Sequence, residues 1–542
     1  MPALRSRLDS REPALARNRE AQLSRLAEVR RLEENVRRHS ALAAPKMRER
    51  GQLLPRERLA RLLDPGAPFV ELMTLAGLGM HDDDGDERPT GGGSIVSIGF
   101  VAGVRVVVLA NDCGIKGGAT TPAGLAKSLR AQEIARTSKL PLIHLVESAG
   151  ANLNYQAEIF VPGGRTFANL ARLSAAGIPV ISVVHGSSTA GGAYLPGLSD
   201  YVIAVRGRAK IFLAGPPLVK AALGQDATDE ELGGAEMHAQ TTGLAEYLAE
   251  DDASALEQAR ELLASLRWDR PADWGTTAGA PPSRYPGEEL LALVPEDYRE
   301  PYDVREVLAR VVDGSEFLDF KERYGPHTVC GFAAIEGHRC GVLGNNGPID
   351  ADGATKAAQF IQLCCQTGTP LVYLQNTTGY MVGKDAESRG IVKHGSKMIQ
   401  AVANATVPQL TVILGASFGA GNYGMCGRSF DPRFVFAWPC SRIAVMGGEQ
   451  AAGVMAMVTE GKWRREGREA GEAERAGLER MKQGLRDRLE QESTALYATA
   501  RVWDDGIIDP RDTRRVLGFT LATCAEAERR VLRGNTFGVA RM

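Results

Sequence analysis

The chain has 542 residues, too many for one hydrophobic core, and its length predicts about two to four domains. It contains 64 Lys and Arg against 66 Asp and Glu, so its formal charge of −2 provides no global basic field for binding nucleic acid. The eight cysteines form no Cys-x-x-Cys pair, and we expect reduced, packed thiols in a cytoplasmic protein. The longest apolar runs are far shorter than the roughly 20 residues of a membrane helix, so no membrane association is expected.

Residues 1–60 predict a charged helical N-terminal arm. Apolar residues recur there at near-helical spacing, at Leu23, Leu26, Val29, Leu32 and Val36. We expect this amphipathic helix to lie on a partner surface, and a solvated arm is the alternative. The segment is rich in Arg but also contains acidic residues, which organellar transit peptides lack, so import is not expected.

The acidic run 81–87, His-Asp-Asp-Asp-Gly-Asp-Glu, suggests calcium. A calcium-binding loop requires acidic residues two apart at fixed positions before its glycine, and Met80 occupies the first of these positions. We therefore expect a solvated loop and no metal in this chain.

The segment 91–118 predicts two strands joined at Ala102-Gly103, and 331–346 repeats this pattern. Helical stretches follow at 122–138 and 354–367, where apolar residues return at intervals of three and four. The order strand, strand, helix, strand, helix, strand predicts an α/β fold.

The apolar stretch 179–200 has a second copy that begins at Val407, because Pro408 lies 229 positions after Pro179 (408 − 179). Upstream, 141–150 matches 370–379 at the same offset. A period this long indicates two copies of one domain and excludes a solenoid, whose repeats span roughly 20–50 residues. We predict an N-terminal domain at 61–270, a Pro- and Gly-rich linker at 271–300 and a C-terminal domain at 301–542. The charged stretch 459–493 predicts an exposed helix or hairpin.

In each copy a strand-like run ends in small residues that could open a helix. Glycine permits a tight turn and close approach of a ligand to the backbone. The first N–H groups of a helix have no intrahelical partner, and the positive end of the helix dipole lies behind them. This geometry predicts an oxyanion hole in each domain, with a tight structural turn as the alternative.

The chain resembles the carboxyltransferase (β) subunits of biotin-dependent acyl-CoA carboxylases from about residue 30 to its C-terminus. It is most similar to the branch acting on 3-methylcrotonyl-CoA and geranyl-CoA. The motifs that carry the resemblance are Ser187-Ser-Thr-Ala-Gly-Gly-Ala-Tyr194, Glu231-Leu-Gly-Gly-Ala235, Gln375-Asn-Thr-Thr-Gly379, Gly419-Ala-Gly-Asn-Tyr-Gly-Met425 and Trp503-Asp-Asp-Gly-Ile-Ile-Asp-Pro510. The resemblance implies two crotonase-like domains in tandem.

The resemblance also implies carboxyl transfer from carboxybiotin to the γ carbon of a 3-methyl-branched, 2,3-unsaturated acyl-CoA. Two oxyanions form in this chemistry, one on the thioester and one on biotin. The amides of Gly191 and Gly192 would face the thioester oxygen, and those of Ala420 and Gly421 would face the ureido oxygen of biotin. Further substrate contacts are expected from Ala149, Gly163, Gly164, Ala193 and Tyr194, and further contacts on the biotin side from Thr378, Gly379 and Gly419.

Methylcrotonyl-type chains carry a Phe where this chain has Gly163, and Tyr155 also departs from the usual Asn-Leu-Pro-Arg-Gln pattern. Removing an aromatic ring leaves space for a longer acyl chain, so geranyl-CoA is the expected substrate. The alternatives are a neutral loop change, with 3-methylcrotonyl-CoA or another acyl-CoA as the substrate.

The sequence has no Ala-Met-Lys-Met biotinylation motif and no phosphate-cradling Gly loop for ATP. We therefore expect a separate biotin-carrying α subunit, and family assembly implies a β-hexamer within an α6β6 complex in which each site pairs domains of two subunits. His185 and His238 are candidate bases, although biotin is expected to supply the base. Glu147 is expected to be a satisfied polar group, and Cys426 a packing residue. The alternatives are a biotin-linked acyl-CoA decarboxylase subunit, a hydratase and a non-catalytic assembly subunit.

Overall fold

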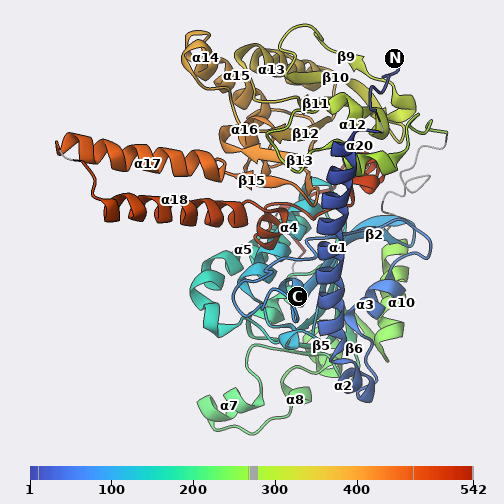
Figure 1. The fold of residues 1–542 in the computed structure, drawn as a ribbon. Coiled ribbons are helices and arrows are strands. Elements are labelled where there is room, and N and C mark those ends of the chain that lie inside the picture. The colour runs from blue at the N-terminus through green and yellow to red at the C-terminus, as the bar shows by residue number, and fades with distance from the viewer. Residues whose placement is uncertain (10, 267, 269–278, 468, 537, 540–542) are drawn as a thin grey trace. The chain divides into compact units, whose positions relative to one another are not determined.

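The computed structural model describes residues 1–542 except 10, 267, 269–278, 468, 537 and 540–542 (Figure 1). Contacts divide the chain into two compact units. Unit 1 comprises Met1–Val29, Thr277–Thr499 and Trp503–Leu521; unit 2 comprises Arg30–Thr276, Ala500–Val502 and Ala522–Met542. Helices α1 (Pro13–Ala41) and α20 (Thr513–Arg529) contribute residues to both units.

Unit 2 contains an eight-stranded sheet in the order β1-β2-β3-β4-β5-β6-β8, with β7 paired to β5. The β2–β3 pair is an antiparallel hairpin, and β3, β4, β5 and β6 run parallel. The strands are β1 (Val70–Leu72), β2 (Ser94–Val101), β3 (Val104–Asn111), β4 (Leu142–Ser148), β5 (Val180–Thr189), β6 (Tyr201–Val205), β7 (Lys210–Phe212) and β8 (Tyr247–Ala249). The helices are α2 (Ala44–Glu49), α3 (Pro55–Leu62), α4 (Pro122–Thr137), α5 (Gln156–Ala175), α6 (Tyr194–Gly197), α7 (Pro216–Leu223), α8 (Asp229–Gly233), α9 (Ala235–Met237) and α10 (Asp252–Ser265).

Unit 1 repeats this topology in a seven-stranded sheet, β14-β13-β12-β11-β10-β9, with β15 paired to β13. Its strands are β9 (Leu318–Asp319), β10 (Thr328–Ile335), β11 (His338–Asn345), β12 (Leu371–Thr377), β13 (Gln409–Phe418), β14 (Phe434–Ala437) and β15 (Arg442–Ala444). Its helices are α11 (Leu290–Leu293), α12 (Val304–Val311), α13 (Ala351–Gln366), α14 (Lys384–Ser388), α15 (Ile391–Ala403), α16 (Gly419–Gly424), α17 (Gly448–Arg465), α18 (Glu472–Glu492) and α19 (Ala495–Ala500).

The matching strand orders confirm the predicted duplication and the α/β class. In each unit an antiparallel hairpin leads through a helix into a parallel strand, a second helix and a long central strand. Those central strands, β5 and β13, are apolar runs buried along most of their length, as is typical of strands covered on both faces. The predicted helices at 122–138 and 354–367 correspond to α4 and α13.

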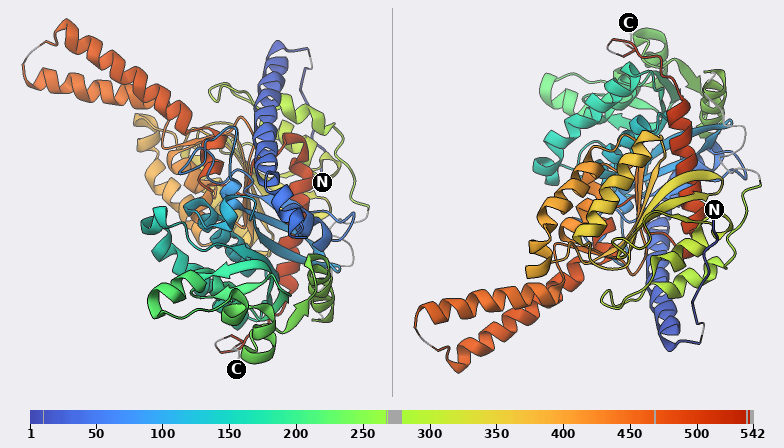
Figure 2. Two further views of the ribbon diagram at one scale, coloured as in Figure 1. Left: turned by 90° about the horizontal axis from the view of Figure 1, so that it is seen from below. Right: turned by 90° about the horizontal axis from the view of Figure 1, so that it is seen from above.

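The charged stretch after residue 459 forms most of a helical hairpin made by α17 and α18 (Figure 1). The two helices lie side by side and extend away from the sheet of unit 1, as both views in Figure 2 show. Their residues are largely exposed, which confirms the predicted hairpin.

The predicted domain boundaries differ from the compact units in three places. Residue 60 falls inside α3, whose Leu59 and Leu62 belong to the core of unit 2. The predicted linker 271–300 lies partly outside the described residues, at 271–278, and its remainder contains α11, whose leucines are buried. The chain end beyond residue 521 belongs to unit 2 and not to unit 1. The predicted N-terminal helix is observed as α1, with Leu26, Val29, Leu32 and Val36 buried.

The prediction of a solvated loop at 81–87 is wrong for Asp83, which is buried. Its carboxylate accepts hydrogen bonds from the amides of Gly79 and Gly85 at 3.0 and 2.8 Å, and from the amide and hydroxyl of Thr90. Asp83 therefore organises the turn that leads into β2. Among the described residues, no helix is long and apolar enough to cross a membrane.

Candidate functional site

The first predicted oxyanion turn directly follows β5. Ala190 begins a 3₁₀ turn, Ala190–Ala193, in the left-handed conformation with a φ of 53°. The short helix α6 then starts at Tyr194. A non-glycine residue in this conformation is strained, and such strain concentrates at functional sites.

The second predicted turn follows β13 in the same way. Gly419 has a φ of 54° and opens α16. Ala420 and Gly421 take the positions of Gly191 and Gly192, and Tyr423 takes that of Tyr194. The two tyrosines are exposed to nearly the same extent, 46% for Tyr194 and 47% for Tyr423.

Each turn is held by a strand that pairs only with the last residues of the central strand. β7 pairs with Ser187–Thr189 of β5, and β15 pairs with Ala416–Phe418 of β13. The residues entering each turn are therefore fixed by main-chain hydrogen bonds on both sides, since β4 and β12 flank the opposite edge. A rigid strand end is what an oxyanion hole requires.

The amides of both turns lie at the start of a helical turn. The first N–H groups of a helical turn have no intrahelical acceptor. Over the described part of the chain, the amides of Gly191, Gly192, Ala420 and Gly421 donate to no backbone oxygen outside their own turns. These four groups could therefore donate hydrogen bonds to an anionic oxygen in each unit.

Unit 2 brings the predicted acyl-side residues together. A Cβ placed on Gly150 would lie 3.4 Å from the carbonyl oxygen of Thr189, so the loop holding Ala149 adjoins the first turn. On α5, the ring of Phe167 lies 5.7 Å from that of Tyr194, and a Cβ on Gly191 would approach Phe167 to 3.6 Å. Helix α5 thus lies beside the turn.

Gly163 and Gly164 lie one helical turn before Phe167 on α5. A Cβ on Gly163 would meet only Ile159, at 3.8 Å, and one on Gly164 would meet nothing within 4 Å. Pro162 precedes them inside the helix, and the neighbouring Phe160 and Val161 are 82% and 78% exposed. The surface of α5 here is open and apolar.

Unit 1 brings the predicted biotin-side residues together. A Cβ on Gly421 would lie 2.8 Å from the Cα of Gly379, which is closer than real Cβ contacts. Thr378 and Gly379 follow β12 directly and therefore adjoin the second turn. Glycine is required at Gly421 because the backbone of Gly379 occupies the space of a side chain.

The sequence reasoning missed the hydroxyls that support both turns. Ser148 Oγ accepts from the amide of Gly150 at 3.1 Å, and Thr377 Oγ1 accepts from the amide of Gly379 at 3.2 Å. Ser188 donates to the carbonyl oxygen of Gly192 at 2.9 Å. Ser148 and Thr377 are separated by the repeat offset of 229, so a residue-by-residue comparison of the copies would have found them.

Neither candidate histidine is available as a base. His238 uses both ring nitrogens, Nε2 with the carbonyl oxygen of Ile211 at 2.7 Å and Nδ1 with the hydroxyl of Thr242 at 2.8 Å. His185 lies within β5 and is fully buried, with Nδ1 3.0 Å from Asp252 Oδ1. Burial and the charge of Arg58 lower the pKa of His185, which favours the neutral ring.

Glu147 and Cys426 behave as expected. Glu147 accepts from Arg58 at 2.7 Å and from Gln52 at 3.1 Å, so both carboxylate oxygens are satisfied. Cys426 is buried, and burial raises the pKa of its thiol well above the usual range, so it packs in the core as a neutral thiol. Within the described residues, no group of three or more His, Cys, Asp or Glu side chains could hold a metal ion.

Comparisons with known proteins agree with this geometry. The profile of the family described as "Carboxyl transferase domain" matches residues 46–536. The chain is 49% identical over 497 residues to a probable biotin-dependent acyl-coenzyme A carboxylase beta2 subunit of Mycobacterium tuberculosis, covering 91% of each chain. It is 50% identical over 481 residues to the biotin-dependent 3-methylcrotonyl-coenzyme A carboxylase beta1 subunit of the same organism, covering 88% of this chain and 89% of the other.

Among solved structures, the chain is similar to the beta subunit of P. aeruginosa geranyl-CoA carboxylase. The sequence identity is 58%, the TM-score is 0.93, and both chains are covered to 100%. The expected fold, two crotonase-like α/β domains in tandem, is confirmed by this agreement over the whole chain.

Proposed function

Because the chain belongs to the carboxyl transferase domain family and is an acyl-CoA carboxylase subunit, we propose that its two backbone turns are the oxyanion holes of carboxyl transfer to geranyl-CoA. The observation that carries this proposal is the pair of matched turns at the ends of the central strands, whose amides donate to no described backbone oxygen outside their own turn.

On the acyl side, the amides of Gly191 and Gly192 bind the thioester oxygen as negative charge develops there. For a 2,3-unsaturated thioester, loss of the C4 proton spreads this charge along a dienolate to the same oxygen, so one hole serves the longer conjugated system. Backbone amides suit this role because they are rigid and need no ionisation, and one such donor contributes roughly 10²–10³ in rate.

On the other side, the amides of Ala420 and Gly421 bind the ureido oxygen of biotin, with Thr378, Gly379 and Gly419 beside it. The fit rests on the close approach of Gly421 to Gly379, which leaves no room for a side chain between the two backbones. Bound carboxybiotin supplies the carboxyl group and the base. This agrees with the two candidate histidines, which are held in other contacts.

The open, apolar surface of α5 supports geranyl-CoA as the substrate. Ala149, Ala193 and Tyr194 line the start of the acyl site, and Gly163 and Gly164 leave space for a branched tail beyond it. The similarity to the P. aeruginosa geranyl-CoA carboxylase subunit points the same way. 3-Methylcrotonyl-CoA is the alternative substrate, because a relative at 50% identity is named as a subunit of 3-methylcrotonyl-coenzyme A carboxylase.

We also propose a separate α subunit that carries biotin, since the relatives are named as β subunits of biotin-dependent carboxylases. A homo-oligomer, a β-hexamer within an α6β6 complex, accounts for large apolar side chains left exposed in both units. Exposed apolar patches of this kind mark interaction surfaces. They include Phe160, Val161, Leu213, Leu218, Leu223, Val445, Val454, Met457 and Val458. The complex would act in the cytoplasm, where ATP and bicarbonate are supplied.

The site supports a hydratase and a non-catalytic assembly subunit less well than a carboxyltransferase. A hydratase needs a pair of acidic residues at the first hole, whereas Glu147 near that turn is already bound by Arg58 and Gln52. A non-catalytic assembly subunit would not need two intact turns. A decarboxylase subunit shares the same holes, so only the direction of the reaction separates it from a carboxylase.

The test is ATP-dependent fixation of radiolabelled bicarbonate into an acyl-CoA by this chain and its biotin-carrying subunit. Fixation that requires both subunits and is blocked by avidin supports the proposal. Release of labelled CO₂ from a carboxylated acyl-CoA, without fixation of bicarbonate into any acyl-CoA, would favour the decarboxylase.

A further inference from the structure

The two central strands share an irregularity just before their turns. In unit 2 the β4–β5 register passes from Val146–Val184 to Ser148–Ser188, so Glu147 alone faces three residues of β5. In unit 1 the register passes from Gln375–Ile413 to Thr377–Ser417, and Asn376 alone faces three residues of β13. Such bulges re-aim a strand, and they are common next to active sites.

In unit 1 a neutral amide fills the bulge. Asn376 Oδ1 accepts from the amide of Ala416 at 2.7 Å, and a Cβ on Gly415 would lie 2.5 Å from that oxygen. The side chain of Asn376 therefore takes the place that a side chain on Gly415 would need. Asn376 is buried and satisfies the bulge directly.

In unit 2 a carboxylate fills the equivalent place. A Cβ on Gly186 would lie 2.5 Å from Glu147 Oε1, which repeats the contact between Gly415 and Asn376. Gln52 Nε2 bridges Glu147 Oε1 at 3.1 Å and the carbonyl oxygen of His185 at 3.4 Å. Gln52 therefore ties the Glu147 side chain to the backbone of the bulge.

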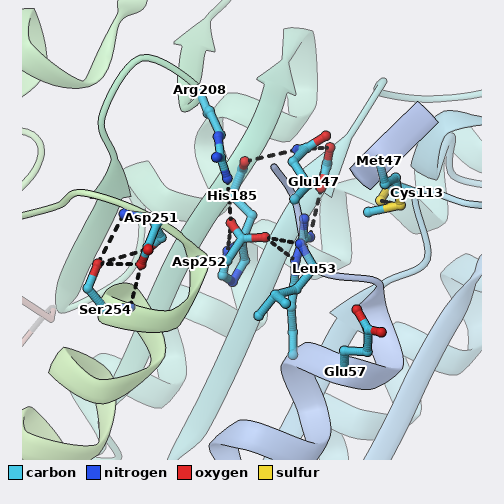
Figure 3. Close-up of polar contacts among 12 residues, drawn as sticks. Met47, Leu53, Glu57, Cys113, Glu147, His185, Arg208, Asp251, Asp252 and Ser254 are labelled. Atoms are coloured by element: carbon cyan, nitrogen blue, oxygen red, sulfur yellow. Dashed lines mark hydrogen bonds and ion pairs between the residues drawn. The ribbon is translucent and has the colours of Figure 1, made fainter. Parts of the chain in front are cut away.

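The charge on Glu147 is balanced within a buried network (Figure 3). Arg58, on α3, donates from Nη1 to Glu147 Oε2 at 2.7 Å and from Nε to Asp252 Oδ2 at 3.2 Å. Asp252, in the first turn of α10, also contacts His185 Nδ1 at 3.0 Å and accepts from the amide of Leu53 at 2.7 Å. We call Gln52, Arg58, Glu147, His185 and Asp252 the β5 ionic network.

The network joins four elements at one point: α3, β4, β5 and α10. Arg58, His185 and Asp252 are almost completely buried, with side-chain exposures of 1%, 0% and 2%. Burying charged groups costs desolvation free energy, so a buried ion pair is weak evidence for stability. Such a pair can nevertheless fix one conformation. No matching network is needed in unit 1, where Asn376 alone fills the bulge.

We propose that the β5 ionic network is the positioning device of the first oxyanion turn, acting on the acyl-CoA side only. The β5 ionic network ends at the bulge, a few residues before Ala190. It thereby fixes the direction of the end of β5 and so the position of Gly191 and Gly192. Because a misplacement of about 1 Å can cost roughly 10²-fold in rate, loosening the bulge should slow transfer to acyl-CoA without altering the second turn.

This inference rests on the proposed function, so its test separates two readouts in the complete complex with the α subunit. The first readout is carboxylation of acyl-CoA, resolved into kcat and KM. The second is the release of radiolabelled CO₂ from carboxybiotin without acyl-CoA, which requires only the biotin side. The variants are Glu147→Gln, Gln52→Leu and, in the matched position of unit 1, Asn376→Ala.

We expect Glu147→Gln to lower kcat for acyl-CoA between ten- and a hundredfold, with a smaller change in KM and CO₂ release within twofold of wild type. Gln52→Leu should give a weaker effect of the same kind, and it covers the case in which Glu147→Gln does not fold. Asn376→Ala should slow both readouts. As a control, Glu526→Gln breaks another buried contact of unit 2, with Arg105 at 2.9 Å, and should spare both readouts in folded protein.

Equal losses in both readouts for folded Glu147→Gln, or no loss in either, would overturn the network's proposed role. If the wild-type complex carboxylated no acyl-CoA, the proposed function itself would fail, whatever the variants did. The two failures are therefore distinguishable.

Discussion

Ala190 and Gly419 share one left-handed backbone conformation, with φ angles of 53° and 54°, at equivalent positions of the two turns. The conformation is forced in both copies, but only one copy uses the residue that adopts it without strain. A left-handed conformation costs a non-glycine residue roughly 1–2 kcal/mol.

This relationship predicts different effects on thermal stability for two substitutions. Ala190→Gly should leave the thermal midpoint nearly unchanged, because relief of strain is offset by the larger entropy that Gly loses on folding, about 0.5–1 kcal/mol. Gly419→Ala should lower the midpoint, because it adds strain and places a Cβ 3.1 Å from the carbonyl oxygen of Val445. Differential scanning calorimetry checks both, and a lower midpoint for Ala190→Gly than for Gly419→Ala would contradict the assignment.

The first hole can be tested with a graded series at Gly192. A Cβ there would have only ordinary contacts, 3.7–3.9 Å from Ser148 and Ser188, so Gly192→Ala should fold normally. The branched methyl groups of Gly192→Val reach beyond this Cβ and should block the approach of the oxyanion. We expect a loss of carboxylation of roughly 10²–10³, the cost of one oxyanion donor. Folded Gly192→Val with a rate within about tenfold of wild type would exclude the role of this turn.

The second hole does not tolerate even the alanine substitution that the first hole should accept. A Cβ on Gly421 would meet the Cα of Gly379 at 2.8 Å, so even Gly421→Ala must move the backbone. We expect Gly421→Ala to lose both thermal stability and carboxylation, whereas Gly192→Ala loses neither to a large extent. Similar behaviour of the two alanine variants would show that the turns are less constrained than their geometry indicates.

Much of the fold could be predicted because the repeat conserves strand order, helix order and the position of each turn. Three features could not be predicted from the sequence: the burial of Asp83, the helix α11 and the β5 ionic network. Asp83 lies in an acidic run that composition assigns to solvent, and the leucines of α11 lie in a Pro- and Gly-rich stretch. The network joins Arg58, Glu147 and Asp252, which are far apart in sequence and carry no shared motif, so only the folded chain reveals their contacts.

Asp504 predicts a pH dependence of stability. Its Oδ1 accepts from the hydroxyl of Thr499 at 2.7 Å and the amide of Gly506 at 2.9 Å, and its buried Oδ2 finds no hydrogen-bond partner among the described residues. Burial raises the pKa of Asp504 to about 7. The negative charge of Asp505 also raises this pKa, whereas the positive charge of Arg428 lowers it. The folded chain therefore holds a proton that the unfolded chain releases above pH ~4, and the free energy of unfolding falls as pH rises from about 4 to about 7.

Asp504→Asn should remove this dependence, because an amide keeps the acceptor Oδ1 without a charge. We expect the variant to melt above wild type at about pH 8 and close to it at about pH 5. Asp505→Asn is the contrasting change, since Asp505 accepts from Arg428 at 2.8 Å and from the amide of Val435 at 2.9 Å, and it should melt lower at both pH values. An Asp504→Asn difference that did not vary with pH would contradict the raised pKa.

Chain-length selectivity should depend on Gly163. A Cβ on Gly163 would contact only Ile159, so Gly163→Phe should fold. The variant would place an aromatic ring on the open surface of α5. We expect it to suppress carboxylation of geranyl-CoA while sparing 3-methylcrotonyl-CoA. Gly164→Ala is the graded comparison, because it adds only one methyl group, which meets nothing within 4 Å, and it should slow geranyl-CoA carboxylation far less than Gly163→Phe. If Gly163→Phe affected both substrates alike, Gly163 would not line the acyl site.

The most direct measurement is kcat/KM of the wild-type complex for geranyl-CoA and for 3-methylcrotonyl-CoA, with the biotinylated α subunit, ATP and bicarbonate. Geranyl-CoA has five more carbons, and burying two of them at about 0.8 kcal/mol each would favour it by roughly tenfold. The account predicts this preference for geranyl-CoA. A preference for 3-methylcrotonyl-CoA would contradict the geranyl assignment, and carboxylation of neither would contradict the proposed function.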